Sequence, residues 1–183
     1  TVGDTVQQRH REATAIDPKA RTVTVTDLNS GEEETLPYDR LVLATGARPM
    51  VFDWPGKDLK GIVTLSGIPD ANAIKGMLQR GARRAVIVGA GLIGLEMAEA
   101  FREKDLEVTV IEAMDRVLPG LLDFEVAAHL QQHLEENGVT VLPSYPAEGF
   151  LGDNDGRVRA VQAGGRELEA DLVLLALGVR PNV

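Results

Sequence analysis

Three glycines at the junction of an apolar run and an amphipathic run carry the clearest chemical signal in this sequence. They are Gly89, Gly91 and Gly94, separated by Ala90, Leu92 and Ile93 in the spacing G-x-G-x-x-G. The first glycine permits a tight turn, the second lets a diphosphate approach the backbone, and the third lets a helix pack closely on a strand. Free N–H groups at the start of that helix offset phosphate charge. The spacing therefore predicts a site for the diphosphate of a dinucleotide.

A carboxylate stands where such a site needs one, at the end of the next apolar run. Glu112 follows Gly89 by 23 residues and closes the run at residues 107–112. A carboxylate there accepts hydrogen bonds from both ribose hydroxyls of NAD and repels the 2′-phosphate of NADP. We therefore expect NAD(H) to be preferred over NADP(H), although the nearby Arg116 leaves NADP open. The competing interpretation is a plain tight turn followed by an unrelated, exposed Glu112.

The elements that must position these residues alternate between strand and helix. The patterns predict strands at 85–88, 108–111 and 139–142, with helices at 91–104 and 124–136. Such alternation is typical of βαβ units, and it predicts an α/β fold with a Rossmann-type parallel sheet and helices on its faces. Shorter strands within residues 146–170 predict an inserted antiparallel β-meander, and residues 171–177 a last apolar strand.

The chain before this region is mainly β in character. Residues 22–27 alternate in the two-residue period of a strand, a turn follows at 29–31, and residues 41–44 form an apolar run that predicts another strand. Asp70 is placed to cap a helix that continues to about Gln79.

Composition excludes several classes of function. The 183 residues contain 19 Lys and Arg against 28 Asp and Glu, a net charge of −9, which argues against nucleic acid as a partner. There is no cysteine, so the chain has no disulfide framework, cysteine nucleophile or zinc–thiolate site. No apolar run approaches the ~20 residues that span a bilayer. We expect a small-molecule dinucleotide as partner, no membrane partner, and a cytoplasmic location.

Three blocks of sequence carry a family resemblance. Residues 38–49, 86–101 (VIVGAGLIGLEMAEAF) and 174–182 (LLALGVRPN) lie in the order and spacing of the FAD-dependent pyridine nucleotide-disulfide oxidoreductases. The chain resembles most the branch that holds coenzyme A disulfide reductases, NADH oxidases and NADH peroxidases. The resemblance implies that hydride passes from NADH to a flavin and on to a disulfide, oxygen or peroxide.

The resemblance also implies roles for single residues. Ile93 and Glu96 match helix residues that face the nicotinamide and its ribose in relatives. Gly178 matches a glycine near the nicotinamide, while Glu112 matches the adenosine-ribose acid. The remaining pair, Thr45 and Gly46, matches a turn beside the flavin nucleotide. Because the cofactors carry the chemistry, we expect no catalytic side chain in this chain.

Several family features are missing from the sequence. It lacks the FAD glycine fingerprint, the redox cysteine, the later Gly-Asp flavin motif and the C-terminal dimerisation domain. We therefore expect an internal fragment, with residues 1–46 closing an incomplete FAD segment and residues 47–183 forming the NAD(P)H-binding domain. FAD belongs to the full-length parent, expected to be a homodimer through the missing domain. The fragment alone is expected to bind NADH, to lose FAD and to be inactive.

Other functions remain open. The same domains occur in ferredoxin or nitrite reductase-type electron-transfer flavoproteins, and a non-catalytic NAD-sensing module is a third possibility. His129 and His133 have a metal-ligating spacing, but the sequence places no third ligand, so we expect no metal site. Residues 153–156 resemble half of a calcium loop and predict a hairpin turn, because Gln162 stands where the loop needs glutamate. Trp54 is expected to pack the connector beside Phe52.

Overall fold

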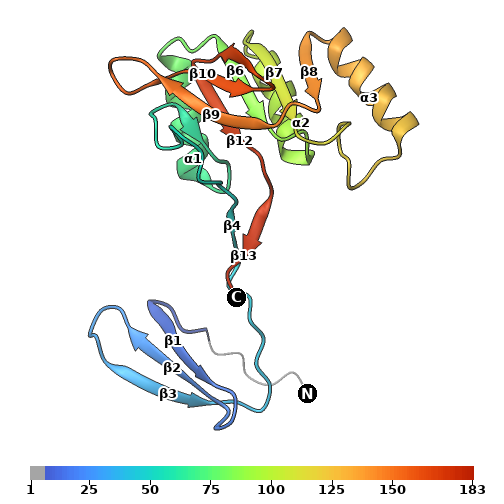
Figure 1. Cartoon of the computed structure of the whole chain (residues 1–183). Helices are drawn as coiled ribbons and strands as arrows, with labels where there is room; N and C mark the ends of the chain where they lie inside the picture. The colour runs from blue at the N-terminus through green and yellow to red at the C-terminus, as the bar shows by residue number, and fades with distance from the viewer. Residues whose placement is uncertain (1–6) are drawn as a thin grey trace. The chain divides into compact units, whose positions relative to one another are not determined.

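The computed structural model describes residues 7–183 and divides the chain into two compact units, Thr1–Thr45 with Val183, and Gly46–Asn182 (Figure 1). Within the described residues, no helix combines the length and the apolar character needed to cross a membrane.

The first unit is a three-stranded antiparallel sheet in the order β1-β2-β3. Its strands are β1 (Arg11–Asp17), β2 (Thr22–Asp27) and β3 (Glu33–Pro37). An aspartate stabilises each turn of this sheet. Asp17, before the turn to β2, accepts hydrogen bonds from the backbone N–H groups of Lys19 and Ala20. Asp27, before the turn to β3, accepts them from the N–H groups of Asn29 and Ser30. Val25 is buried at 7% exposure, but most of the sheet's side chains are exposed.

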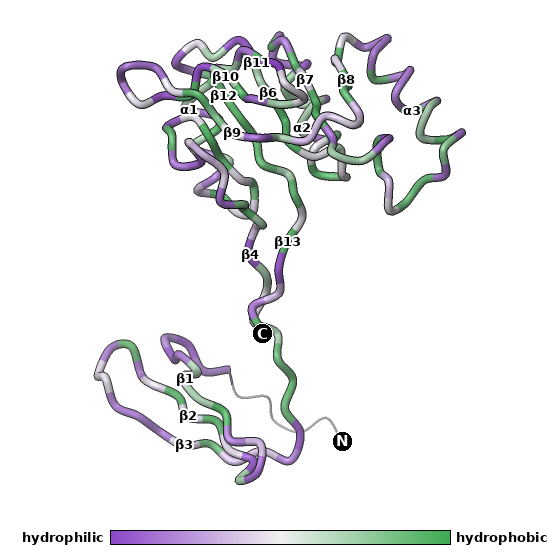
Figure 2. The backbone as a smooth tube through the Cα atoms, in the orientation of Figure 1, coloured by the Kyte–Doolittle hydropathy of each residue, from purple (hydrophilic) through white to green (hydrophobic). Residues whose placement is uncertain are grey.

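The prediction of a strand at residues 41–44 is wrong. Residues 41–46 form no strand, and Val42 is 85% exposed with Leu43 at 53%. Figure 2 shows this hydrophobic stretch in the connection between β3 and β4. An extended run becomes a strand only when a neighbour bonds its backbone, and no described strand pairs with this run. The nearest strand is β4 (Ala47–Pro49), which pairs with β13 (Val179–Pro181).

The second unit is built on a five-stranded parallel sheet in the order β5-β12-β6-β7-β8, which confirms the predicted α/β fold. Its strands are β5 (Ile62–Val63), β12 (Leu172–Leu175), β6 (Arg84–Val88), β7 (Glu107–Glu112) and β8 (Val139–Pro143). The helices are α1 (Ile68–Gln79), α2 (Leu92–Arg102) and α3 (Phe124–Glu136). The predicted meander is also present, as β9 (Ala147–Gly152), β10 (Val158–Ala163) and β11 (Arg166–Glu169).

The central strands are buried on both faces, as their continuous apolar sequences predict. Ala85 and Ile87 of β6 face a core that also holds Met77 of α1, Phe101 of α2 and Ala127 of α3. The alternate residues of the same strand, Val86 and Val88, face a second core, shared with Phe150, Val161 and other meander residues. The helices therefore cover one face of the sheet and the meander covers the other, which corrects the expectation of helices on both.

Helix boundaries follow from local chemistry, with one correction. Asp70 does not cap α1 but lies in its first turn, where it accepts hydrogen bonds from the backbone N–H and hydroxyl of Ser66. The helix begins at Ile68, two residues before Asp70. Pro69 fits in this first turn because a backbone N–H there would have no helical partner. After α2, Asp105 adopts φ +60°, a left-handed conformation that aspartate occupies at modest cost.

Candidate dinucleotide-binding site

The glycine turn joins β6 to α2 in the geometry that its spacing predicts. Gly89 has φ +108°, and a Cβ there would lie 2.5 Å from the carbonyl oxygen of Ala176. A Cβ on Gly94 would lie 2.1 Å from the carbonyl oxygen of Gly89. Both positions therefore need glycine for close packing, one between neighbouring strands and one between helix and turn.

The fold itself does not require glycine at Gly91, because the structure leaves open space where a side chain would be, and a glycine keeps that space free for a ligand. No atom lies within 4 Å of an added Cβ, and the residue has an extended backbone with φ −82° that any amino acid adopts. Gly91 is the N-cap of α2, and no side chain caps this helix. The N–H of Leu95 donates to the carbonyl of Gly91 at 3.0 Å, which is the first turn of the helix, so the amides before Leu95 have no helical carbonyl one turn earlier to bond.

Glu112 reaches back from the end of β7 to the glycine turn. Its Oε2 accepts a hydrogen bond from the backbone N–H of Ala90 at 2.8 Å, and its Oε1 accepts one from Met114 at 2.9 Å. These two bonds hold the carboxylate of a half-buried side chain beside the turn. The carboxylate therefore points toward the start of α2. The glycine turn and the acid that the sequence predicts for one site lie side by side.

A cavity of about 610 Å³ connects the turn to the other strand ends. Most of its walls come from the last residues of β6 and β7 and from residues that follow β6, β7, β8 and β12, at the carboxyl edge of the parallel sheet. Ligands of open α/β sheets bind at this edge. The lining includes Gly89, Gly91, Glu112 and Gly178 among the predicted residues. It also includes residues that the sequence did not single out for binding: Phe52, Trp54, Ala113, Pro119, Gly120, Tyr145, Pro146 and Ala147.

The remaining predicted residues have different surroundings. Ile93 is 45% exposed on α2. Glu96 is exposed and lines a separate groove between α2 and α3, which also contains His133. Gly46 has φ +72° and accepts a hydrogen bond from Asn182. Thr45 belongs to the first unit. The structure thus gathers four predicted residues around one cavity, and the binding roles of all the predicted residues stay predictions.

Some of the additional cavity residues could have been predicted from the sequence, because ligands of open α/β sheets bind beside the residues that follow the strands. Ala113 comes directly after β7 and Tyr145 two residues after the end of β8, so both lie at the same sheet edge as the glycine turn. Phe52 and Trp54 come from an irregular connector, whose path periodicity does not reveal. The ring centroids of Trp54 and Phe150 lie 5.9 Å apart in an edge-on arrangement, so Trp54 packs the connector as expected. It also lines the cavity.

Two other candidates have ordinary structural settings. His129 and His133 are exposed on α3. Among residues 7–183, no group of three or more His, Cys, Asp or Glu side chains is arranged to hold a metal ion. Residues 153–156 form the predicted hairpin turn between β9 and β10, in which Asp153 accepts hydrogen bonds from Asp155 and Arg157.

Comparison with known protein families gives one match along almost the whole chain. The family described as pyridine nucleotide-disulphide oxidoreductase matches residues 2–183. An NADH oxidase of Methanocaldococcus jannaschii is 40% identical over 169 residues, which cover 92% of this chain and 37% of that protein. The ferredoxin–NAD(+) reductase component of the biphenyl dioxygenase system of Paraburkholderia xenovorans is 44% identical, covering 80% of this chain and 35% of that protein. The chain thus spans little more than a third of these relatives.

Solved structures have the same fold. The water-forming NADH oxidase of Lactobacillus brevis bound to NADH superposes with a TM-score of 0.81 at 34% identity, covering 94% of this chain and 38% of that one. An engineered NADPH oxidase made from it, bound to NADPH, has a TM-score of 0.81 at 31% identity, with 94% and 38% covered. The engineered protein carries replacements of a glycine, an aspartate, an alanine, a methionine and a proline.

Proposed function

Because the chain belongs to the pyridine nucleotide-disulphide oxidoreductase family, we propose that it forms the NADH-binding part of an FAD-dependent oxidoreductase. A bound reduced nicotinamide supplies a hydride, and the protein supplies binding and orientation. The observation that carries this proposal is the hydrogen bond from Ala90 to Glu112, which joins the two predicted halves of the site at one cavity.

The residues fit a dinucleotide from one end of the cavity to the other. The diphosphate lies over Gly91, where no side chain blocks it and where the amides at the start of α2 face the ligand. Glu112 accepts hydrogen bonds from the adenosine ribose. Gly178, with φ +86° and open space at its Cβ position, leaves room at the far end for the nicotinamide. Ile93 and Glu96 do not line this cavity, so their nicotinamide-facing roles in this proposal rest on the resemblance alone.

We propose NADH rather than NADPH as the preferred ligand. In the engineered NADPH oxidase, the replaced aspartate, alanine, methionine and proline follow the replaced glycine by 18, 19, 20 and 25 residues. The same spacing from Gly94 in this chain leads to Glu112, Ala113, Met114 and Pro119. This chain thus has the acid and the small and apolar residues of the NADH-bound parent, not the arginines of the NADPH-bound variant.

The proposal has two versions, which differ in the electron acceptor of the full-length protein. Relatives named NADH oxidase favour oxygen, peroxide or a disulfide as the acceptor of the full-length protein. The 44% identity to a ferredoxin–NAD(+) reductase component favours an electron-transfer protein instead. The chain contains no cysteine, so a thiol that reduced a disulfide would have to come from outside it. FAD and a homodimer belong to the full-length protein in this proposal, and Thr45 with Gly46 is the part of this chain assigned to the flavin.

Fluorescence titration of the 183-residue chain with NADH and NADPH tests the proposal. We expect saturable binding of NADH and weaker binding of NADPH, without turnover. Tighter binding of NADPH would contradict the role given to Glu112. Binding of neither nucleotide would remove the case for a dinucleotide site, and so would NADH binding whose affinity Gly91→Asp leaves unchanged.

A further inference from the structure

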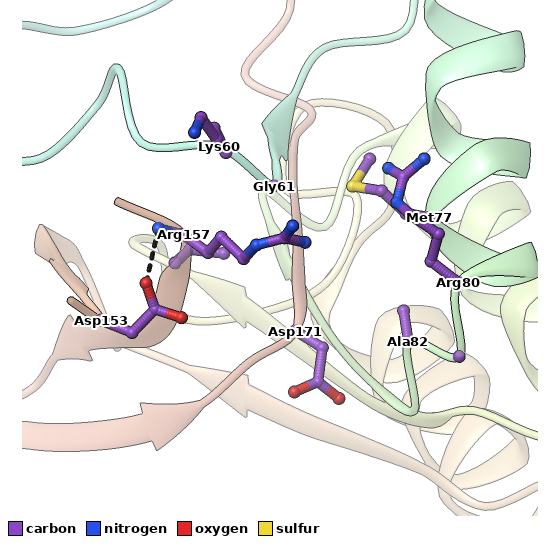
Figure 3. Close-up of a pocket in the computed structure, with 10 residues that line it drawn as sticks. Lys60, Gly61, Met77, Arg80, Ala82, Asp153, Arg157 and Asp171 are labelled. Carbon is purple, nitrogen blue, oxygen red and sulfur yellow. Dashed lines mark hydrogen bonds between the residues drawn. The ribbon is translucent and has the colours of Figure 1, made fainter. Parts of the chain in front are cut away.

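A second cavity, of about 450 Å³, lies at the opposite edge of the parallel sheet. It is lined by residues that precede the parallel strands: Gly61 before β5, Ala82 before β6 and Asp171 before β12. Because parallel strands all start at one edge and end at the other, this cavity is separate from the glycine turn. Its charged lining consists of Lys60, Arg80, Arg157, Asp153 and Asp171 (Figure 3).

The backbones of two of the three cationic residues, Lys60 and Arg157, are held side by side by hydrogen bonds. The N–H of Lys60 donates to the carbonyl of Gly156 at 3.0 Å, and the N–H of Val158 donates to the carbonyl of Lys60 at 2.8 Å. These bonds form a parallel bridge between Lys60 and Arg157. Arg80 follows the end of α1 and approaches from another wall (Figure 3). The three side chains therefore come from separate, fixed segments.

The two carboxylates in the cavity wall are already engaged by other groups. Asp171 accepts hydrogen bonds from the backbone N–H groups of Arg83 and Arg84 and pairs with the Arg84 guanidinium at 2.8 Å. Asp153 accepts hydrogen bonds from two backbone N–H groups of its own turn. In Figure 3 the Arg157 side chain extends across the cavity, while the carboxylate of Asp171 points away from it.

Among the described residues, the guanidinium groups of Arg80 and Arg157 thus form no ion pair, although the Asp153 carboxylate attracts Arg157 and Lys60 at longer range. Within residues 7–183, neither has a side-chain hydrogen bond or lies within ion-pair distance of a carboxylate. The Nζ of Lys60 makes one long contact of 3.4 Å, to the carbonyl of Asp155. The whole chain has a net charge of −9. The lining of this cavity, by contrast, has three cationic side chains and two carboxylates, so its net charge is positive.

The carboxyl end of α1 does not cancel this positive charge. A helix end repels anions through its unbonded carbonyls. Here the backbone N–H groups of the next three residues bond the carbonyls of the last turn; the donors are Arg80, Gly81 and Ala82, and the acceptors are Gly76, Met77 and Leu78.

We propose that this second cavity binds a small anion that carries a phosphate group. Arginine guanidinium groups match phosphate oxygens with paired N–H donors, and a lysine ammonium adds a point charge. A phosphate monoester carries close to two negative charges at neutral pH, which suits three cations. The volume accommodates a phosphate with a short organic substituent. The proposal does not depend on dinucleotide binding at the other edge.

Arginine side-chain NMR signals of the 183-residue chain provide the test. Inorganic phosphate and glycerol 3-phosphate are titrated separately, with sodium chloride adjusted to keep the ionic strength constant. We expect saturable shifts of the Nε–Hε signals of Arg80 and Arg157. Equal affinity for both probes shows that the phosphate group alone is recognised, tighter binding of inorganic phosphate identifies the free ion, and tighter binding of glycerol 3-phosphate identifies a monoester.

Substitutions distinguish phosphate binding in this cavity from nonspecific attraction of phosphate to positive surface charge. Arg157→Gln and Arg80→Gln are expected to weaken phosphate binding about tenfold each, the loss of one charge-assisted contact. Arg159→Gln is the matched control, because Arg159 is also exposed on the β10 side but pairs with Glu167 outside the cavity. Gly91→Asp controls for phosphate bound at the glycine turn and should leave the shifts unchanged. Shifts that never saturate, or an equal loss in Arg159→Gln, would overturn the proposal.

Discussion

The backbone N–H of Ala90 lies 2.8 Å from Oε2 of Glu112, and this contact links the glycine turn to the end of the following strand. The second oxygen of the same carboxylate bonds the N–H of Met114. A carboxylate has about four lone-pair sites, so two remain for the hydroxyls of a ribose. The backbone therefore fixes the orientation of Glu112 before any ligand arrives, which lowers the ordering cost of binding.

Exchanging the residues around Glu112 should exchange the cofactor preference. Glu112→Ala combined with Ala113→Arg, Met114→Ser and Pro119→Arg removes the repelling carboxylate and adds two cations for the 2′-phosphate. We expect at least tenfold tighter binding of NADPH and weaker binding of NADH in fluorescence titrations. Gly94 is kept in this design because a Cβ there meets the carbonyl of Gly89 at 2.1 Å.

The control for this exchange is Glu107→Ala, which removes an exposed carboxylate from the other end of β7. Its ratio of NADH to NADPH affinity should match the starting protein. An unchanged ratio in the fourfold variant would show that Glu112 and its neighbours do not contact the adenosine ribose.

Substitutions at Gly91 and Gly89 should separate binding from stability. Gly91→Asp meets no atom within 4 Å and places a favoured residue at an N-cap, so its free energy of unfolding should change by less than about 0.5 kcal/mol. Its charge repels a diphosphate, and NADH binding should weaken more than about tenfold. Gly91→Asn is the neutral control of similar size and should bind NADH better than the aspartate variant.

At Gly89 we expect a substitution to lower the stability of the fold. An L-residue at φ +108° is strained, by roughly 1–2 kcal/mol in a left-handed conformation, and its Cβ would lie 2.5 Å from the backbone of Ala176. We expect Gly89→Ala to lower the free energy of unfolding by more than about 2 kcal/mol in urea denaturation. A variant as stable as the starting protein would mean that the turn is held less closely against β12.

Acid stability should depend on Asp171. Partial burial of this carboxyl works against ionisation, but hydrogen bonds from the Arg84 side chain and from the N–H groups of Arg83 and Arg84 outweigh it, so its pKa lies below the usual 3.8. A lowered folded-state pKa contributes stability that is complete above the unfolded value and is lost as the pH falls through the folded value.

Asp171→Asn should therefore destabilise the protein by about 1–2 kcal/mol at pH 7, a partly exposed charge-assisted interaction. The difference from the starting protein should shrink as the pH is lowered below about 4. Urea denaturation between pH 7 and pH 3 measures both. Asp155→Asn, in the exposed turn between β9 and β10, is the control, and a pH-independent difference for Asp171→Asn would contradict this role.

The parallel sheet and the core of the site could be predicted because their signals are local. The spacing from Gly89 to Glu112 is set by one strand, one turn and one helix, so sequence distance fixes spatial distance. Residues 41–44 have the same apolar character as a buried strand, yet strand formation depends on a partner that periodicity does not reveal. Phe52 reaches the cavity through an irregular connector, for which the sequence offers no period to extend.

The single tryptophan supplies a probe of the candidate site. Trp54 is the only tryptophan of the chain, it lines the cavity beside Phe52, and their ring centroids lie 5.2 Å apart. Bound NADH would lie close to this indole, so we expect saturable quenching of tryptophan emission together with sensitised nicotinamide emission. Trp54→Phe should abolish both signals while calorimetric NADH binding weakens by less than about tenfold, because an aromatic ring still packs on Phe150. Calorimetric binding without any quenching in the starting protein would place the nucleotide away from this cavity.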